Sequence, residues 1–346
     1  MAEKKYLFYI SQNYSFAILR PVQDEIIRRG DQVKWFLYRD ANPDYLKPHE
    51  IALESIEDVI RYNPVASLVP GNVIPNFIPG LKVQVFHGFD PGKINRRSGN
   101  AHFQIRNCFD LYCTQGPNTT TRFKELAKQL GHFKAIETGW PALDPLFHQG
   151  EVPAPHPRPT ILMCSTFSRN LTCAPHLYET VKQLSQYNRW QWLIQFHPKM
   201  AKNIVDMYKD LENENLKFIE TDNVIPLLQQ ADVMVCDTSS VLIMFALQGK
   251  PVVTFKNANP KPYLIDIDNP EHLQSAIEKA LQPSPELHNH LNHLVEDTHP
   301  YRDGKSAGRV LDAIDEMLSG KYPLKPRPKN WLRQFKMRRK LGYWKL

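Results

Sequence analysis

The sequence is poor in cysteine and contains no long apolar run. Its five cysteines are an odd number and none is spaced as a CxxC pair, so the sequence indicates free thiols in a reducing compartment and predicts no zinc site. No apolar run approaches the roughly 20 residues that a membrane-spanning helix needs. The chain also enters an apolar strand directly, without the apolar core and cleavage site of a signal peptide. Together these absences predict a cytoplasmic protein.

Acidic residues are absent from residues 321–346, although this segment contains ten Lys and Arg residues. These ten account for the net charge of +7, because the remaining 33 basic and 36 acidic residues leave a net charge of about −3. Trp331, Phe335 and Trp344 are interleaved with the cations, a composition typical of segments at the surface of anionic membranes. We therefore expect a basic aromatic tail outside the folded body, with nucleic-acid binding or simple disorder as the alternatives.

The 346 residues are enough for two domains of roughly 150 residues each. Short apolar runs alternate with helical patterns in both halves, which predicts two α/β domains built on parallel sheets. One such helix is expected over residues 17–29, with Pro21 in its first turn. The proline-rich residues 149–159 predict a linker between an N-terminal domain, residues 1–148, and a C-terminal domain, residues 160–320. Ligands of such Rossmann-like domains bind in a cleft at the carboxyl ends of the strands.

Residues 231–253 predict a strand, a hydroxyl-rich turn and a short helix in succession. The apolar run Val233–Cys236 has the length of a buried parallel strand, and a helix is expected from Val241. Between them lies the turn Asp237-Thr238-Ser239-Ser240, at the carboxyl end of the strand. Free N–H groups at a helix start, together with hydroxyl groups, suit a phosphate ligand. The alternative is an ordinary N-capped core helix.

Two histidines follow predicted strands in the same way. His87 ends the apolar run that begins at Lys82, and Gly88 after it allows a ligand to approach the backbone. His197 ends the apolar run of residues 191–196. A histidine at the carboxyl end of a parallel strand is well placed for proton transfer. The alternative is that carbonyl groups of the loop simply satisfy its hydrogen bonds.

Six segments of the chain, taken together, resemble motifs of one known family, the CDP-glycerol glycerophosphotransferases, which build teichoic-acid-like poly(glycerol phosphate). In chain order the segments are KVQVFHGFDPGK, FDLYCT with IETGWPALD, ILMCSTF, FHPK, ADVMVCDTSSVLIMFALQGKPVV and YRDGKSAGRV. The first is similar to the family pattern Q-x-W-H-G…K, and the fifth to D-x-L-I-T-D-Y-S-S-V…D…A-L…K-P. The resemblance extends over roughly residues 65–310 in family-like order; each motif alone is weak, whereas six in sequence are strong.

The sequence departs from the family pattern at four positions. Thr238 stands where the family usually has Tyr, and Ala142 stands where it often has Arg. Arg169 is displaced by one position from the arginine after the corresponding family turn. Met244 falls where an acidic residue is typical. Because such an acid can hold a ribose hydroxyl in related folds, Met244 bears on which donor nucleotide is bound.

The resemblance implies a GT-B-like fold, with two Rossmann-like domains facing each other across a cleft. It implies transfer of glycerol phosphate from CDP-glycerol to a hydroxyl group of a cell-envelope glycan or lipid-linked acceptor, with release of CMP. His87 would be the general base, and His197 would hold the donor diphosphate. The implied donor-binding residues are Gly88, Thr166, Arg169, Asp237, Thr238, Ser239, Ser240 and Lys305, with Lys93 and Asp303 as charge support. No permanently bound cofactor and no metal site is expected, and a need for a divalent metal ion stays open.

A lipid-linked acceptor favours the membrane as the partner of residues 321–346. We therefore expect a cytoplasmic protein that associates peripherally with the inner face of the cell membrane and binds no nucleic acid. Two alternatives remain open. One is a nucleotide-sugar-dependent GT-B glycosyltransferase of capsule or lipopolysaccharide synthesis, favoured if Met244 changes how the donor nucleotide is held. The other is an inactive scaffold of envelope assembly, against which the retention of both histidines and both serines argues.

Overall fold

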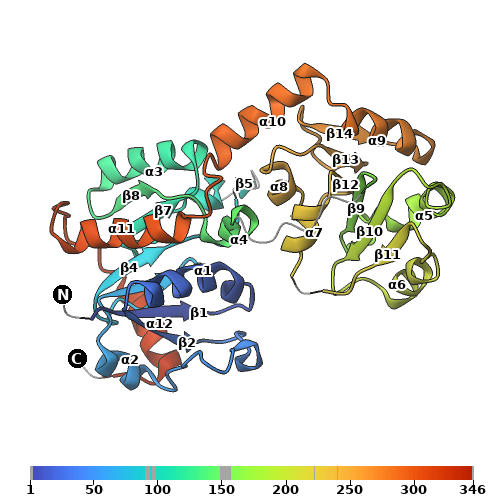
Figure 1. Cartoon of the computed structure of the whole chain (residues 1–346). Coiled ribbons are helices and arrows are strands. Elements are labelled where there is room, and N and C mark those ends of the chain that lie inside the picture. Colours follow the sequence, from blue (N-terminus) through green and yellow to red (C-terminus); the bar gives the residue numbers. More distant parts are fainter. Residues whose placement is uncertain are drawn as a thin grey trace. The chain divides into compact units, whose positions relative to one another are not determined.

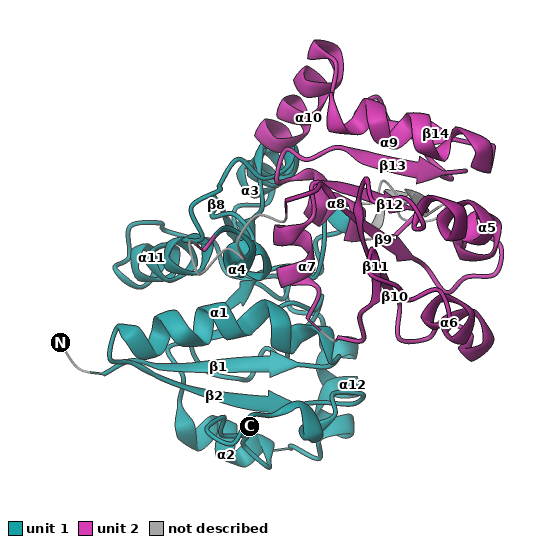
Figure 2. Cartoon of the chain, turned by 45° about the vertical axis from the view of Figure 1, so that its right-hand side comes forward, with its two compact units in different colours: residues 1–147, 298–346 teal, residues 148–297 magenta. Residues whose placement is uncertain are grey.

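The structure, a computed structural model, describes residues 3–89, 94–95, 99–148, 157–221, 223–239 and 241–344. Lys93 and Ser240 of the predicted site, and most of the predicted linker, lie outside the described residues. The chain forms two compact units, which Figure 2 distinguishes by colour. Unit 1 comprises residues 1–147 and 298–346, and unit 2 comprises residues 148–297.

Unit 1 is built on a six-stranded parallel sheet with the strand order β2-β1-β3-β4-β7-β8 (Figure 1). Its strands are β1 (Lys5–Ile10), β2 (Gln32–Leu37), β3 (Ala66–Val69), β4 (Leu81–Gln84), β7 (Leu111–Thr114) and β8 (Lys134–Glu137). Its helices are α1 (Tyr14–Arg28), α2 (Ile56–Tyr62), α3 (Pro117–Leu130), α4 (Asp144–Phe147), α11 (Ser306–Leu318) and α12 (Trp331–Leu341), with the 3₁₀ turns η1 (Pro43–Tyr45), η2 (Ala101–Phe103) and η3 (Pro141–Leu143). A short antiparallel pair, β5 (Ile94–Asn95) and β6 (Gly99–Asn100), follows β4 in the chain.

The helix ends of unit 1 follow from local sequence. Ser55 and Asp58 form a capping box at the start of α2, in which each side chain accepts a hydrogen bond from the other residue's backbone N–H. Gly131 ends α3 with a φ of +75°, a value that glycine adopts without strain. The prediction for Pro21 was wrong, because α1 begins at Tyr14 and places the proline in its interior. The buried apolar face of α1 offsets the hydrogen bond that Pro21 removes.

Unit 2 is built on a second six-stranded parallel sheet, with the order β11-β10-β9-β12-β13-β14. Its strands are β9 (Thr160–Ser165), β10 (Gln191–Phe196), β11 (Leu216–Phe218), β12 (Val233–Cys236), β13 (Val252–Phe255) and β14 (Leu264–Ile267). Its helices are α5 (Ala174–Leu184), α6 (Lys202–Lys209), α7 (Ile225–Gln230), α8 (Val241–Ala246), α9 (Leu273–Leu281) and α10 (Pro285–Thr298), with the 3₁₀ turn η4 (Pro270–His272). Strands β9 and β12 are buried along their whole length, as parallel strands covered on both faces are. The two predicted Rossmann-like sheets are confirmed.

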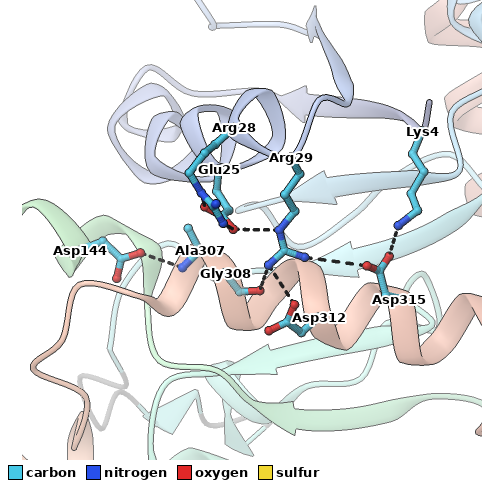
Figure 3. A network of polar contacts seen from close by, with 9 residues as sticks. All are labelled: Lys4, Glu25, Arg28, Arg29, Asp144, Ala307, Gly308, Asp312 and Asp315. Atoms are coloured by element: carbon cyan, nitrogen blue, oxygen red, sulfur yellow. Dashed lines mark hydrogen bonds and ion pairs between the residues drawn. The ribbon is translucent and has the colours of Figure 1, made fainter. Parts of the chain in front are cut away.

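Helix α11 belongs to unit 1, and not to the domain of residues 160–320 in which the sequence analysis placed it. Figure 3 shows the polar contacts between this helix and the start of the chain. Arg29, at the end of α1, forms an ion pair with Asp312 at 2.9 Å, and Lys4 pairs with Asp315 at 2.7 Å. Helical periodicity identifies such a helix but carries no information about which of two sheets it covers.

The described part of residues 321–346 also packs on unit 1, so the expectation of a tail outside the folded body was wrong. Arg327 forms an ion pair with Asp110 at 3.2 Å. Tyr343 is buried and stacks on Phe77 with ring centroids 5.0 Å apart. The aromatic side chains of this segment thus divide into two groups. Tyr343 packs into the core of unit 1, whereas Trp331, Phe335 and Trp344 are exposed.

Candidate active site

His87 lies just beyond the carboxyl end of β4 in unit 1. Phe86, immediately before it, has a positive φ of 59°, a conformation that costs roughly 1–2 kcal/mol for a residue with a side chain. Packing holds Phe86 there, because its buried ring lies 5.1 Å from the ring of His102 and 5.2 Å from that of Phe123, centroid to centroid. The strand therefore ends in a sharp turn, and the His87 side chain is exposed after it.

Two contacts fix the imidazole ring of His87. Its Nδ1 atom lies 3.1 Å from the carbonyl oxygen of Pro70, the residue that follows β3. Its ring stacks on Tyr14 with the centroids 5.6 Å apart. A carbonyl oxygen can only accept a hydrogen bond, so Nδ1 must carry the proton. The neutral ring therefore has an unprotonated Nε2 atom, which can act as a base.

The backbone next to His87 has free space on one side and is held by a hydrogen bond from Gln115. A Cβ atom on Gly88 would meet no atom within 4 Å, so this glycine leaves free space beside the backbone. The carbonyl oxygen of Gly88 accepts a hydrogen bond of 2.9 Å from Nε2 of Gln115, which is buried directly after β7. Gln115 was missed by sequence reasoning. Its signal was its place directly after the apolar segment FDLYCT, as His87 directly follows the run that begins at Lys82.

A third histidine, His299, is buried in unit 1 and was also missed. Its Nε2 accepts a hydrogen bond of 2.9 Å from the backbone N–H of Trp140, and the indole N–H of Trp140 donates to the carbonyl oxygen of Phe86 at 3.4 Å. Burial lowers the pKa of His299 to about 4, so the ring is neutral. His299 thus supports the turn that presents His87. Its only sequence signal was its place just before the YRDGK segment.

Asp303 and Lys305 lie in unit 1, and not in the second domain as predicted. Asp303 forms an ion pair with Arg309 and accepts a hydrogen bond of 3.1 Å from the backbone N–H of Lys305. The carboxylate is therefore used within the protein, whereas the side chain of Lys305 is exposed. Gly139 packs tightly against this segment: its φ is +79°, and a Cβ atom there would lie 2.5 Å from Oγ of Ser306.

Asp237 organises the corresponding edge of unit 2. It follows β12, is fully buried, and accepts a hydrogen bond of 2.7 Å from Oγ of Ser165. Its carboxylate also accepts from the backbone N–H groups of Thr166 at 3.0 Å and Cys173 at 3.1 Å. These bonds tie the end of β12 to the loop after the neighbouring strand β9. Asp237 therefore positions the turn, and its oxygens are engaged within the protein.

The two described hydroxyl groups of the turn after β12 differ in their partners. Oγ1 of Thr238 accepts a hydrogen bond of 3.0 Å from the backbone N–H of Ala258. Within the described ranges, Oγ of Ser239 accepts a single, long hydrogen bond of 3.4 Å from the backbone N–H of Val241 at the start of α8. Both residues are half-buried. Ser239 is consequently the better placed of the two to bind a ligand.

The other predicted donor-binding residues of unit 2 lie near this turn or on its helix. Thr166 begins the loop after β9, and its backbone N–H is bound by Asp237. Arg169 lies in the same loop with an exposed side chain. Met244, the residue at the position of the missing acid, is half-buried on α8.

His197 follows β10 and has the opposite hydrogen bonding to His87. Its Nδ1 atom accepts a hydrogen bond of 3.0 Å from the backbone N–H of Lys199. An N–H group can only donate, so Nδ1 is unprotonated and the neutral ring carries its proton on Nε2. Partial burial, and then the charge of Lys199, lower the pKa of His197 and favour that neutral form. The ring of Phe167 lies 4.5 Å away, centroid to centroid.

A cavity of about 470 Å³ lies beside His197. It is lined by Gln195, Phe196, His197, Pro198, Val205, Phe218, Ile219, Glu220 and Thr221. Because β10, β9 and β12 are adjacent parallel strands, their carboxyl ends bring His197, Thr166 and Ser239 to one edge of the sheet. Across the ranges that the structure describes, no three His, Cys, Asp or Glu side chains gather in a group that could hold a metal ion.

Comparison with known protein families gives one match. The family described as CDP-glycerol:poly(glycerophosphate) glycerophosphotransferase matches residues 87–263. This range is just over half of the chain, begins at His87 and includes His197 and the turn after β12. No curated protein sequence matches the chain significantly.

Several solved structures are similar in fold. A protein of Listeria monocytogenes described as a UDP-N-acetylglucosamine 2-epimerase has a TM-score of 0.65 and 16% identity, covering 95% of this chain and 100% of its own. A variant of the wall teichoic acid polymerase TagF, soaked with CDPG, has a TM-score of 0.63 and 14% identity, covering 92% of this chain and 90% of its own. At these identities the likeness concerns the fold alone, and it confirms the predicted GT-B-like architecture.

Proposed function

The chain belongs to the CDP-glycerol:poly(glycerophosphate) glycerophosphotransferase family, and from this premise we propose how its residues move glycerol phosphate. It is an enzyme, so the scaffold alternative falls away, as does a glycosyltransferase that uses nucleotide sugars. The proposed reaction transfers glycerol phosphate from CDP-glycerol to a hydroxyl group of a cell-envelope acceptor. The acceptor oxygen bonds to the β-phosphorus, the bond from that phosphorus to CMP breaks, and CMP leaves.

His87 is the proposed general base, and the hydrogen bonding of its ring is the observation that carries the proposal. With its Nδ1 proton held on the Pro70 carbonyl oxygen, the ring offers Nε2 to the acceptor hydroxyl and takes its proton. General base catalysis of this kind typically contributes about 10²- to 10⁴-fold. The stacked ring of Tyr14 keeps the imidazole plane fixed, and the open backbone at Gly88 leaves room for the acceptor.

His197 and Ser239 are the proposed ligands of the donor diphosphate. His197 donates through its Nε2–H, since its Nδ1 is taken by the N–H of Lys199. Phosphoryl transfer asks the protein mainly to position the groups and to stabilise charge on phosphoryl oxygens, which hydrogen-bond donors do. The cavity of about 470 Å³ beside His197 is large enough for the nucleoside part of the donor. Arg169 and Lys305, both exposed, supply positive charge.

The proposed acceptor is a glycan or lipid-linked molecule of the cell envelope, as the TagF likeness suggests. Such an acceptor requires the enzyme at the inner face of the cell membrane, in contact with anionic lipid through the exposed side chains of α12. None of the helices in the described residues is long and apolar enough to cross a membrane.

The identity of the leaving nucleotide tests this proposal. Purified enzyme is incubated with CDP-glycerol and a glycerol-phosphate-terminated acceptor, and the nucleotide products are separated. Release of CMP with gain of phosphorus in the acceptor is the expected result. Release of CDP would mean that glycerol alone is transferred, and turnover of UDP- or GDP-sugars in place of CDP-glycerol would overturn the donor assignment.

A further inference from the structure

A second, smaller cavity lies in unit 1, at the carboxyl ends of β1 and β2, and is closed on one side by α12. Its volume is about 220 Å³. A water molecule occupies about 30 Å³ in the liquid, so the cavity has room for a phosphate group. Four of its nine lining residues are Lys or Arg, namely Arg39, Arg333, Lys336 and Lys340, and no acidic residue lines it.

Three of these cations form no ion pair with a carboxylate in the part of the chain that the structure describes, although the charge of the adjacent Asp40 acts on Arg39. Among the described residues, no ion pair joins Arg39, Lys336 or Lys340 to a carboxylate. Arg333 is held in place by the carbonyl oxygen of Arg106. Like charges gathered around one cavity repel each other, and charge-assisted hydrogen bonds to an anion relieve that repulsion.

The hydroxyl group of Tyr9 also points to a missing ligand. Tyr9 is 2% exposed and lines this cavity. Its hydroxyl group has no hydrogen-bond partner among the described residues, and a buried hydroxyl left unpaired costs about 1–3 kcal/mol. Tyr9 lies inside β1, one residue before its end, and its ring is buried. The ring therefore cannot turn out to solvent, whereas an anion in the cavity would accept the hydrogen bond of its hydroxyl group.

Exposed apolar side chains on α12 and just after it indicate where this anion comes from. Trp331 is 68% exposed, Leu332 71%, Phe335 55% and Trp344 54%. On a helix of 3.6 residues per turn, Lys336 lies between Leu332 and the cavity residue Lys340. An anion site next to exposed aromatic and aliphatic side chains matches the two layers of a membrane surface, which are the phosphates of the headgroups and the apolar region beneath them.

We propose that this pocket binds the phosphate of an anionic lipid headgroup, with Lys336, Lys340, Arg39 and the hydroxyl of Tyr9 as its ligands. The neighbouring Trp331, Leu332 and Phe335 enter the interface beside it. The proposal rests on the membrane location given above for the proposed function, and it replaces diffuse attraction to a charged surface by a defined site.

Vesicle binding tests the site with a charge-matched pair of variants. One protein carries Lys336→Gln with Lys340→Gln, and the control carries Lys329→Gln with Arg339→Gln, which removes the same charge from exposed positions outside the cavity. Co-sedimentation is measured with vesicles of phosphatidylglycerol in phosphatidylcholine. The pocket pair should bind at least tenfold more weakly than the control pair. Equal losses in the two pairs would overturn the site in favour of diffuse electrostatics.

The variant Tyr9→Phe tests the hydroxyl group without changing charge. Its melting temperature should be at least that of the wild type, because the substitution removes a buried hydroxyl that has no partner among the described residues, and its vesicle binding should weaken about threefold or more. Unchanged vesicle binding would remove Tyr9 from the site. Glycerol phosphate in solution distinguishes the source of the phosphate: if it binds the pocket as tightly as the vesicles do, the lipid assignment is overturned.

Turnover of CDP-glycerol with a soluble acceptor is measured on the same proteins. It should be unchanged in the variants, since none of these residues is placed at His87 or His197. Absence of CMP release by the wild type, with normal vesicle binding, would refute the proposed reaction and leave the lipid site standing. Normal CMP release with no vesicle binding at low salt would refute the lipid site alone.

Discussion

His87 and His197 both follow a strand of a six-stranded parallel sheet, one in each unit, and yet they present opposite hydrogen-bonding groups. Each follows a parallel strand, and each is exposed. At His87 the neighbour of Nδ1 is a carbonyl oxygen, 3.1 Å away, so Nε2 is a base. At His197 the neighbour of Nδ1 is a backbone N–H, 3.0 Å away, so Nε2 is a donor. A single backbone contact therefore decides what each imidazole can do.

The difference fits a reaction that needs both groups. A proton must leave the acceptor hydroxyl, and negative charge on the donor diphosphate must be held as CMP departs. If both imidazoles were bases, no N–H group would be left to hold the diphosphate. If both were hydrogen-bond donors, no base would be left for the acceptor hydroxyl.

The largest effect is expected for His87→Ala. Loss of the base should lower kcat by about 10²- to 10⁴-fold while the Kd for CDP-glycerol stays unchanged. Steady-state kinetics and equilibrium binding of CDP-glycerol, measured on the same preparation, check both parts. Near wild-type kcat in this variant would show that His87 is not the base.

His299, a buried histidine of unit 1, extends the comparison, because its protonation changes the stability of the fold and not the reaction. Burial lowers the pKa of His299 to about 4, below the usual value of about 6.5. Between these values the unfolded chain binds a proton that the folded chain does not, so the free energy of unfolding falls as the pH falls from about 6.5 toward 4. The loss for one such group is on the order of 3 kcal/mol.

Urea denaturation at several pH values checks this prediction. The variant His299→Gln should show a smaller fall in the free energy of unfolding over the same range. Some fall should remain, because burial also lowers the pKa of His132. Identical pH dependence in the wild type and the variant would contradict the assignment.

A smaller effect is expected for His197→Ala, on binding rather than on proton transfer. A hydrogen bond to a charged group contributes about 1.5–3 kcal/mol, so the Kd for CDP-glycerol should rise by roughly 10- to 150-fold. Isothermal titration of CDP-glycerol measures it, with inorganic phosphate as the reference anion. An unchanged Kd would leave His197 without a role in donor binding.

The smallest effect is expected for Ser239→Ala. Among the residues that the structure describes, the hydroxyl of Ser239 accepts a single, long hydrogen bond of 3.4 Å from the N–H of Val241. Solvent and that N–H compete for it, so the Kd for CDP-glycerol should rise only about tenfold, the lower end of the range for a charged partner. Thr238→Val is the matched control, because Oγ1 of Thr238 already accepts from the N–H of Ala258. Equal effects of the two substitutions would contradict a specific role for Ser239.

The sequence was enough to predict which residues lie at the strand ends, but not which other elements pack around them. Apolar runs followed by polar residues place His87, His197 and Ser239 correctly, because burial of a parallel strand requires such runs. The placement of α11 could not be predicted, since contacts such as Arg29 with Asp312 join residues far apart in the chain.

The proton positions on the two rings were equally beyond sequence reasoning. The proton position on His87 depends on the carbonyl oxygen of Pro70, which follows another strand. The proton position on His197 depends on the backbone N–H of Lys199, which donates to its Nδ1 atom. The burial of Tyr343 against Phe77 was hidden in the same way, because a cation-rich segment gives no sign that one of its aromatic residues enters a core. Contacts between residues far apart in the chain decide the ring of His87 and the burial of Tyr343, whereas the ring of His197 depends on the backbone geometry of a residue two positions away.

Glutamine substitutions at both histidines test the central claim most directly. The amide nitrogen of glutamine can stand in for an Nε2–H donor, but glutamine cannot act as a base at neutral pH. The kcat and the Kd for CDP-glycerol are measured for His87→Gln and His197→Gln beside the two alanine variants. We predict that His197→Gln recovers most of the affinity for CDP-glycerol lost in His197→Ala, whereas His87→Gln is as slow as His87→Ala. Recovery of kcat at residue 87 with no recovery of affinity at residue 197 would contradict this prediction.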